Sequence, residues 1–117
     1  MTTTLFILND APYGSELVYN GLRLAGALAK RPEQRVRVFL MGDAASCARA
    51  GQKVPSGFYN VELMLKAVLG RGGEVRVCGT CMDARGLASE ALMEGAARST
   101  LDELTDWTVE ADKVLVF

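Results

Sequence analysis

The chain opens with a continuous apolar and β-branched run, Thr3 to Leu8, which ends at Asn9-Asp10. A run without alternating polar residues is typical of a strand buried on both faces, and such strands belong to parallel sheets. From Leu17 to Leu28, apolar residues then recur at helical spacing until Lys30-Arg31-Pro32 ends the pattern. The start of the chain therefore predicts a strand followed by the crossover helix of a βαβ unit.

The same alternation of strand and helix patterns continues along the chain. Strands are expected at 3–8, 35–41, 74–78 and 113–117. Helices are expected at 17–28, 44–49, 58–69 and 100–111, with a loop at 51–57 and a short helix plus loop at 87–97. Short connections between alternating elements indicate a mainly parallel sheet with helices on both faces. The expected fold class is α/β, a three-layer sandwich, with residues 1–117 forming a single domain.

Composition excludes several classes of function. The net charge is −1 and Lys and Arg are scattered, which argues against nucleic acid or an anionic membrane surface as a partner. No apolar run approaches the roughly 20 residues that span a bilayer, and the N-terminus lacks a basic segment before an apolar one. We therefore expect a cytoplasmic protein that binds neither nucleic acid nor membrane.

Histidine is absent, and the chain has three cysteines. Hydrolases with a Ser-His-Asp triad, Cys-His proteases and histidine zinc sites each lose a central residue. An odd number of cysteines without a secretion signal argues against a disulfide framework and favours free thiols. The sequence also lacks the glycine patterns of nucleotide-binding loops. We expect no cofactor and no metal.

Polar residues follow the ends of three expected strands. Asn9-Asp10, Gly42-Asp43 and Cys78-Gly79 each stand directly after an apolar run. Parallel strands end on one edge of their sheet, where open α/β sheets bind ligands. This rim is the predicted site. Its candidate pocket residues are Asn9, Asp10, Gly42, Asp43, Gly79, Thr80 and Arg85.

Within the rim, Cys78 and Cys81 have C-x-x-C spacing. A helical turn opening at Met82 or Asp83 would lower the pKa of a nearby thiol, because the N-terminus of a helix offers backbone N–H groups and partial positive charge. Arg85 would stabilise an anionic sulfur or bind a partner's carboxylate. We therefore take Cys78 and Cys81 as the candidate catalytic residues.

Other interpretations of these residues remain open. Cys78 would otherwise be a small buried hydrophobe, and Arg85 a solvated charge. A structural zinc site needs four ligands, for which the chain could add only Cys47 or carboxylates such as Asp43. Thioredoxin-type chemistry fits the spacing but finds no suitable proline downstream. Cys47 is expected to pack within a helix, and Asp43 to cap one.

Several motifs in order give the chain a family resemblance. They are Ala11-Pro12-Tyr13-Gly14 after the first strand, Phe39-Leu40-Met41-Gly42-Asp43, Gly57-Phe58-Tyr59-Asn60, Cys78 with Arg85-Gly86 downstream, and the closing Ala111 to Phe117. With this order and spacing the chain resembles the DsrE/DsrF-like family of small sulfur-handling proteins, which have the YchN-like fold. The resemblance covers nearly the whole length.

The resemblance implies a cytoplasmic α/β subunit that assembles into homo-oligomers, trimers or hexamers, with pockets near subunit boundaries. It also implies sulfur-donor and sulfur-acceptor proteins or small thiols as partners, with sulfane sulfur carried as a persulfide at the position of Cys78. Cys81 departs from relay proteins of the family, which tend to have a small apolar residue there. The function expected is sulfur carriage on Cys78, with Cys81 as a resolving thiol. The alternatives are a thiol-disulfide redox protein using both cysteines and a non-catalytic oligomeric binding module.

Overall fold

The computed structural model describes residues 1–117. The fold contains one five-stranded sheet, in which every pair of neighbouring strands is parallel. The strands are β1 (Thr2–Leu8), β2 (Gln34–Leu40), β3 (Glu74–Cys78), β4 (Ala96–Ser99) and β5 (Lys113–Val116). Their order across the sheet is β4-β3-β2-β1-β5. The apolar opening run forms β1, which lies inside the sheet and is mostly buried, as its composition predicts.

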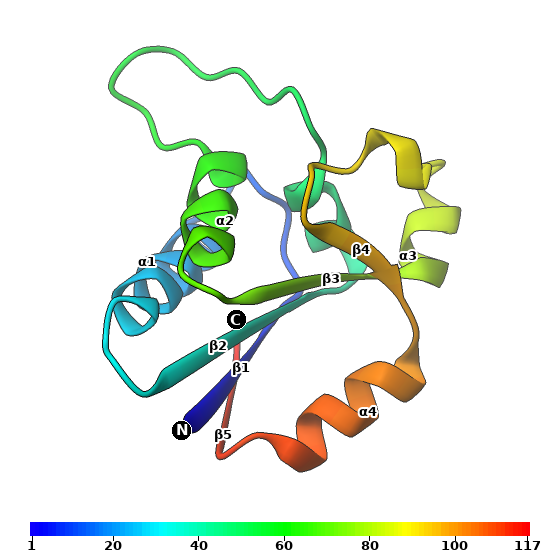
Figure 1. Ribbon diagram of the computed structural model, residues 1–117. Helices are drawn as coiled ribbons and strands as arrows, with labels where there is room; N and C mark the ends of the chain where they lie inside the picture. Colours follow the sequence, from blue (N-terminus) through cyan, green and yellow to red (C-terminus); the bar gives the residue numbers. More distant parts are fainter.

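Helices cover both faces of the sheet (Figure 1). The α-helices are α1 (Leu17–Ala29), α2 (Val61–Gly70), α3 (Gly79–Ala84) and α4 (Leu101–Glu110), and two 3₁₀ helices are η1 (Gly42–Ala48) and η2 (Ser89–Ala91). From β1 to β4 the chain steps in one direction across the sheet, and from β4 to β5 it returns to the far side of β1. Because parallel crossovers are right-handed, this reversal places α4 on the face opposite α1 and α2. The predicted three-layer α/β sandwich is confirmed.

Two apolar clusters fill the spaces between the layers. The larger includes Phe6, Leu22 and Leu65 and lies between the sheet and the layer of α1 and α2. The smaller consists of Leu5, Phe39, Leu104 and Trp107 and lies under α4. At the margin of the smaller cluster, the Arg37 guanidinium stacks on Trp107, 4.8 Å from the ring centroid, and pairs with Glu74 and Glu110. The charge of this buried arginine is therefore balanced by two carboxylates.

The largest difference from the predicted elements is at residues 87–97. The expected short helix is reduced to the 3₁₀ turn η2, and Ala96–Ser99 form β4, a strand that the sequence pattern does not reveal. Its sequence Ala-Ala-Arg-Ser has little preference for strand structure. It becomes a strand because Val75 to Cys78 in β3 offer a free edge with which it pairs.

Two smaller corrections concern helix starts. Helix α2 begins at Val61 rather than Phe58, because the Asn60 side chain accepts a hydrogen bond from the Leu63 N–H and caps the helix. Phe58 is 69% exposed and lies outside the apolar stripe. At α4, Thr100 caps the Glu103 N–H at 3.2 Å, as expected, but the Glu103 carboxylate accepts from Ser99 instead of completing a capping box.

No helix in the structure has the length and apolar character needed to cross a membrane.

Candidate active site

Cys78 ends β3 and is also the N-cap of α3. Its Sγ accepts a hydrogen bond from the Cys81 N–H at 3.4 Å. The helix begins at Gly79, three to four residues before the expected start at Met82 or Asp83. The correct start turns the free N–H groups of the first turn directly toward Cys78.

Gly79 allows the neighbouring strand to approach this turn. A Cβ at this position would lie 2.9 Å from the Ser99 carbonyl oxygen and 3.0 Å from the Arg98 side chain. The Arg98 side chain could move aside, but the contact with the Ser99 backbone is too short for a carbon atom, so a larger residue would push β4 away from the strand end. The glycine after Cys78 therefore has a steric role, and it keeps β4 beside the thiol.

The two thiols of the C-x-x-C motif lie side by side. The Cys81 Sγ is 2.7 Å from the Cys78 Sγ, and both side chains are partly exposed. Residues three apart on a helical turn face the same side, which brings the sulfurs together. A disulfide has a sulfur–sulfur bond of about 2.05 Å. Cys81 is therefore close enough to attack a sulfur on Cys78 with little backbone movement.

The surroundings of the two thiols differ, and they shift the two pKa values in opposite directions. Burial alone would raise the pKa of Cys78, but hydrogen bonds from the Cys81 thiol, from Thr80 and from the first backbone N–H groups of α3 hold that pKa below its ordinary value. Burial and the neighbouring Cys78 raise the pKa of Cys81, against a smaller effect of the Gly42 N–H. Cys78 is thus the more acidic of the two thiols, and the Cys81 thiol donates a hydrogen bond to its sulfur.

Arg85 and Asp43 join α3 to η1 beside the thiols. Arg85 donates two hydrogen bonds to Asp43 Oδ1, at 3.0 and 2.8 Å, and a third to the Cys81 carbonyl oxygen at 3.1 Å. Asp43 is not the expected helix cap, since Met41 has that position in η1. Both residues therefore hold the second thiol in place, and Arg85 makes no hydrogen bond to either sulfur.

A pocket of about 460 Å³ opens beside Cys78, on the sheet face that α4 covers. Gly79, Thr80 and Cys81 line it together with six residues that sequence reasoning missed. These are Phe39, Met41, Arg98, Ser99, Thr100 and Leu101. Four of the six belong to β4 or directly follow it, so the missed strand explains the missed wall. Phe39 and Met41 lie two residues apart at the end of the expected second strand, so their side chains point to the same face of the sheet. This alternation along the strand was the signal that could have placed both residues at the pocket.

A model of the DsrE/DsrF-like family matches residues 3–117. The chain belongs to this family. Protein YchN of Escherichia coli strain K12 is 42% identical to it over 118 residues, covering 100% of both proteins. Uncharacterized protein MK0008 of Methanopyrus kandleri is 35% identical over 111 residues, covering 95% of this chain and 90% of the relative. The crystal structure of the ychN protein from E. coli superposes with a TM-score of 0.93, covering 100% of both chains.

Membership of the DsrE/DsrF-like family confirms the resemblance and the architecture. None of these relatives has an activity in its name. The chemistry proposed for this member therefore depends on its own residues.

The remaining predicted site residues reach the rim but not the pocket. Asn9 and Asp10 follow β1, two strands away from β3. Asn9 donates to the Phe117 carbonyl oxygen at 3.5 Å, and Asp10 accepts from Ser15. Cys47 is fully buried as expected, and burial raises its pKa to about 12. These three residues hold the loops after β1 and β2 and take no part in the thiol pair.

Alkylation of Cys78 is expected to depend on pH in a way that reports its lowered pKa. The thiolate is the reactive form, so the alkylation rate should rise with pH and then reach a plateau. The midpoint of this rise should lie below the pKa of about 8.5 of a free cysteine. Cys81, whose pKa is raised, should need higher pH. Mass spectrometry of peptides after brief iodoacetamide treatment measures each site. Thr80→Val removes one donor and should move the Cys78 midpoint upward; a midpoint at or above that of free cysteine would contradict the assignment.

Proposed function

We propose that the protein carries sulfane sulfur as a persulfide on Cys78. The observation that supports this most is the position of Cys78 Sγ at the start of α3, where hydrogen bonds stabilise a thiolate that lines an open pocket. A thiolate is the nucleophile that sulfur transfer needs. Membership of the DsrE/DsrF-like family is consistent with this chemistry.

The transfer consists of two displacement reactions at sulfur. The Cys78 thiolate attacks the outer sulfur of a donor persulfide R–S–SH, forming Cys78–S–SH and releasing the donor thiolate RS⁻. An acceptor thiolate then attacks the outer sulfur of Cys78–S–SH, which transfers the sulfur and returns Cys78 as a thiolate. The N–H groups of the first turn of α3 stabilise the negative charge on Cys78 before loading and after transfer.

A second fate of the persulfide follows from the 2.7 Å distance between the two sulfurs. The Cys81 thiolate attacks the inner sulfur of Cys78–S–SH, forms a Cys78–Cys81 disulfide and releases HS⁻. The protein would then act as a reductase of persulfides, and a reductant thiol would have to restore it. The same pair would serve the alternative function of a thiol-disulfide redox protein.

The proposal includes partners and a cellular setting. Donor and acceptor are proteins or small thiols that carry sulfur, and the protein acts in the cytoplasm as a homo-oligomer, a trimer or hexamer. A reducing compartment suits the free thiols. The competing view is a binding module in which the cysteines have no chemical role, and the experiment below separates the two.

The test is release of the donor's thiol, the step common to both fates of the persulfide. The reduced protein is mixed with glutathione persulfide, and the released glutathione is counted per chain. The wild type and the control variant Cys47→Ser should each release one glutathione, since Cys47 is fully buried. Cys78→Ser should release none. Equal release from Cys78→Ser and the wild type, or none from the wild type, would refute the proposal.

A further inference from the structure

Three side chains that contain sulfur line the Cys78 pocket. They are those of Met41, Cys78 and Cys81. The parallel register pairs Leu40 of β2 with Val77 of β3, so the next residues along, Met41 and Cys78, stand beside each other. Neighbours in register point to the same face of a sheet. The pocket therefore has a thioether next to its two thiols.

Packing holds these sulfur atoms around one hollow. Met41 and Cys78 both pack against the smaller apolar cluster under α4, and Met41 is half-buried. The Cys81 Sγ is 2.7 Å from the Cys78 Sγ, and both cysteines are partly exposed. Three soft sulfur atoms thus face a cavity of about 460 Å³ that an ion can enter.

Ligands for harder cations are absent from this pocket. The chain has no histidine, and no Asp or Glu lines the cavity. Asp43 is paired with Arg85, and Cys47 is buried in the larger apolar cluster. No group of three or more Cys, Asp and Glu side chains in the fold is positioned to hold a metal ion. Structural zinc needs four ligands, and magnesium or calcium needs several oxygen atoms, so none of these ions fits.

We propose that Cys78, Cys81 and Met41 together bind one Cu(I) ion. Thiolates and thioethers are the soft ligands that select Cu(I), and this ion is stable with only two or three of them. The two thiols give up their protons to solvent as their sulfurs bind the ion, and no electron is transferred. The site departs from the expectation of no metal, which considered only cysteine, histidine and carboxylate ligands.

The pocket suits the complex that would form. One Cu⁺ held by two thiolates has a net charge of −1, and Arg98 is the one charged residue that lines the cavity. Its side chain lies against Gly79, directly after Cys78, and two hydrogen bonds to Asp83, at 2.7 and 2.9 Å, fix the guanidinium there. The ion must separate the two sulfurs beyond 2.7 Å, which rotation of the partly exposed Cys81 side chain allows.

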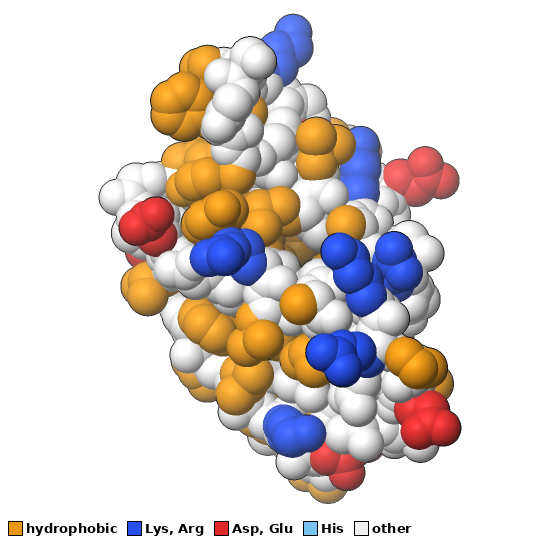
Figure 2. All heavy atoms as spheres, turned by 90° about the vertical axis from the view of Figure 1, so that its left-hand side faces the viewer, with side chains coloured by type: hydrophobic (Ala, Val, Ile, Leu, Met, Phe, Trp, Pro, Cys, Tyr) orange, Lys and Arg blue, Asp and Glu red, His pale blue; other side chains and the backbone are white.

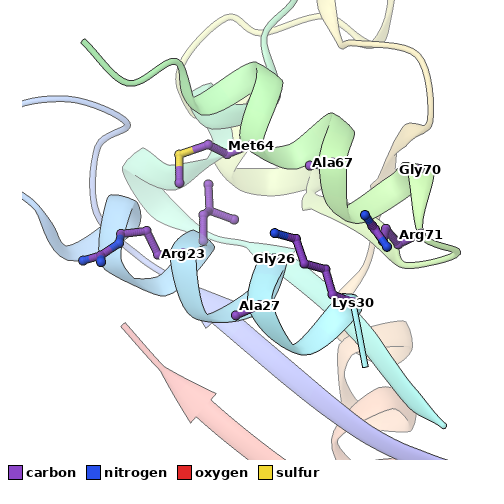
Figure 3. A pocket seen from close by; sticks show the side chains of 9 residues that line it. Arg23, Gly26, Ala27, Lys30, Met64, Ala67, Gly70 and Arg71 are labelled. Carbon is purple, nitrogen blue, oxygen red and sulfur yellow. The ribbon is translucent and has the colours of Figure 1, made fainter. Parts of the chain in front are cut away.

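The hollow between α1 and α2 offers a comparison within the same molecule. Its volume is about 600 Å³, and it contains a methionine but no cysteine. Residues that line it include Met64, Arg23, Lys30 and Arg71 (Figure 3). Figure 2 shows Lys and Arg side chains gathered over this side of the molecule. A single thioether among three cations cannot hold a positive ion, so Met64 is the matched control for Met41.

Competition with bicinchoninate, a chelator that turns violet with Cu(I), tests the site in the absence of oxygen. The reduced wild type should take up one Cu(I) per chain and bleach the colour. Cys78→Ser and Cys81→Ser should each lose this uptake, because only one thiol is left. Met41→Leu should lower the affinity by about tenfold, the lower end of the loss when a residue that supports a metal site is removed.

Two controls separate loss of the site from loss of the fold. Met64→Leu replaces an equally half-buried methionine by a side chain of similar volume, and its affinity should equal that of the wild type. Wild type oxidised to the Cys78–Cys81 disulfide has no substitution at all and should take up no Cu(I). Circular dichroism of every sample reports whether the chain is folded.

Three results would overturn the site. They are no uptake by the reduced wild type, uptake by a single-cysteine variant equal to that of the wild type, and equal affinities of Met41→Leu and Met64→Leu. Copper binding does not depend on sulfur carriage. Glutathione release from glutathione persulfide, measured on metal-free samples, reports the persulfide proposal independently, so the two proposals can fail separately.

Discussion

Cys81→Ser is expected to accumulate the Cys78 persulfide and to release no sulfide. In the wild type, with no acceptor present, the thiol 2.7 Å away should displace HS⁻ and leave an intramolecular disulfide. The two proteins therefore differ in their products. Intact mass after loading with glutathione persulfide should show one added sulfur atom in Cys81→Ser and the loss of two hydrogen atoms in the wild type, and sulfide can be measured in solution.

Serine and alanine at position 81 separate two roles of this side chain. The serine hydroxyl can still donate to the Cys78 sulfur, so loading should remain fast. Alanine removes the donor, so the pKa of Cys78 should rise and loading should slow near neutral pH, because less thiolate is present. If the persulfide is equally long-lived in Cys81→Ser and the wild type, Cys81 does not resolve it and the protein is a simple carrier.

Trp107→Ala should be the most destabilising single change in the layer under α4. The indole is 4% exposed, makes an edge contact with Phe39, and lies under the guanidinium groups of Arg37 and Arg76. Truncation of a buried aromatic side chain costs about 3–5 kcal/mol, and here it also removes the ring on which the buried Arg37 stacks. Since domains of this size are stable by about 5–15 kcal/mol, urea unfolding should show a large fall in the midpoint.

Val109→Ala is the matched control on the same helix. Val109 is 81% exposed, so its truncation should change the free energy of unfolding by no more than about 0.5 kcal/mol. A similar midpoint for the two variants would mean that α4 contributes little to the fold. Because α4 carries Leu101 to the pocket, Trp107→Ala should also loosen the wall beside Cys78.

Most of the architecture follows from local patterns in the sequence. The runs around Phe6, Val38 and Val75 are apolar enough to predict buried strands, and the helices between them follow from apolar spacing. Parallel strands then bring Gly42 and Cys78 to one edge. Cys78 could be selected from the sequence because it ends a strand, and its neighbour Cys81 because of the C-x-x-C spacing.

What the sequence could not predict depends on contacts between distant residues. Ala96–Ser99 form a strand only because the edge of β3 is free, and no local preference shows it. Without β4, the wall made by Arg98 to Leu101 cannot be placed. The partners of Arg85 and Asp43 were likewise unpredictable, since they are 42 residues apart and each had a reasonable local role.

The order of strands also has a consequence for the newly made chain. The opening strand β1 pairs on one side with β2 and on the other with β5, which is synthesised after the other four strands. The hydrogen bond from the Thr3 N–H to Asp112 alone spans 109 residues. Until β5 arrives, the apolar edge of β1 has no partner, and an unpaired edge of this kind is a template for aggregation. Strand β5 therefore protects the edge of β1, and a chain that stops short of Lys113 would leave that edge open to other chains.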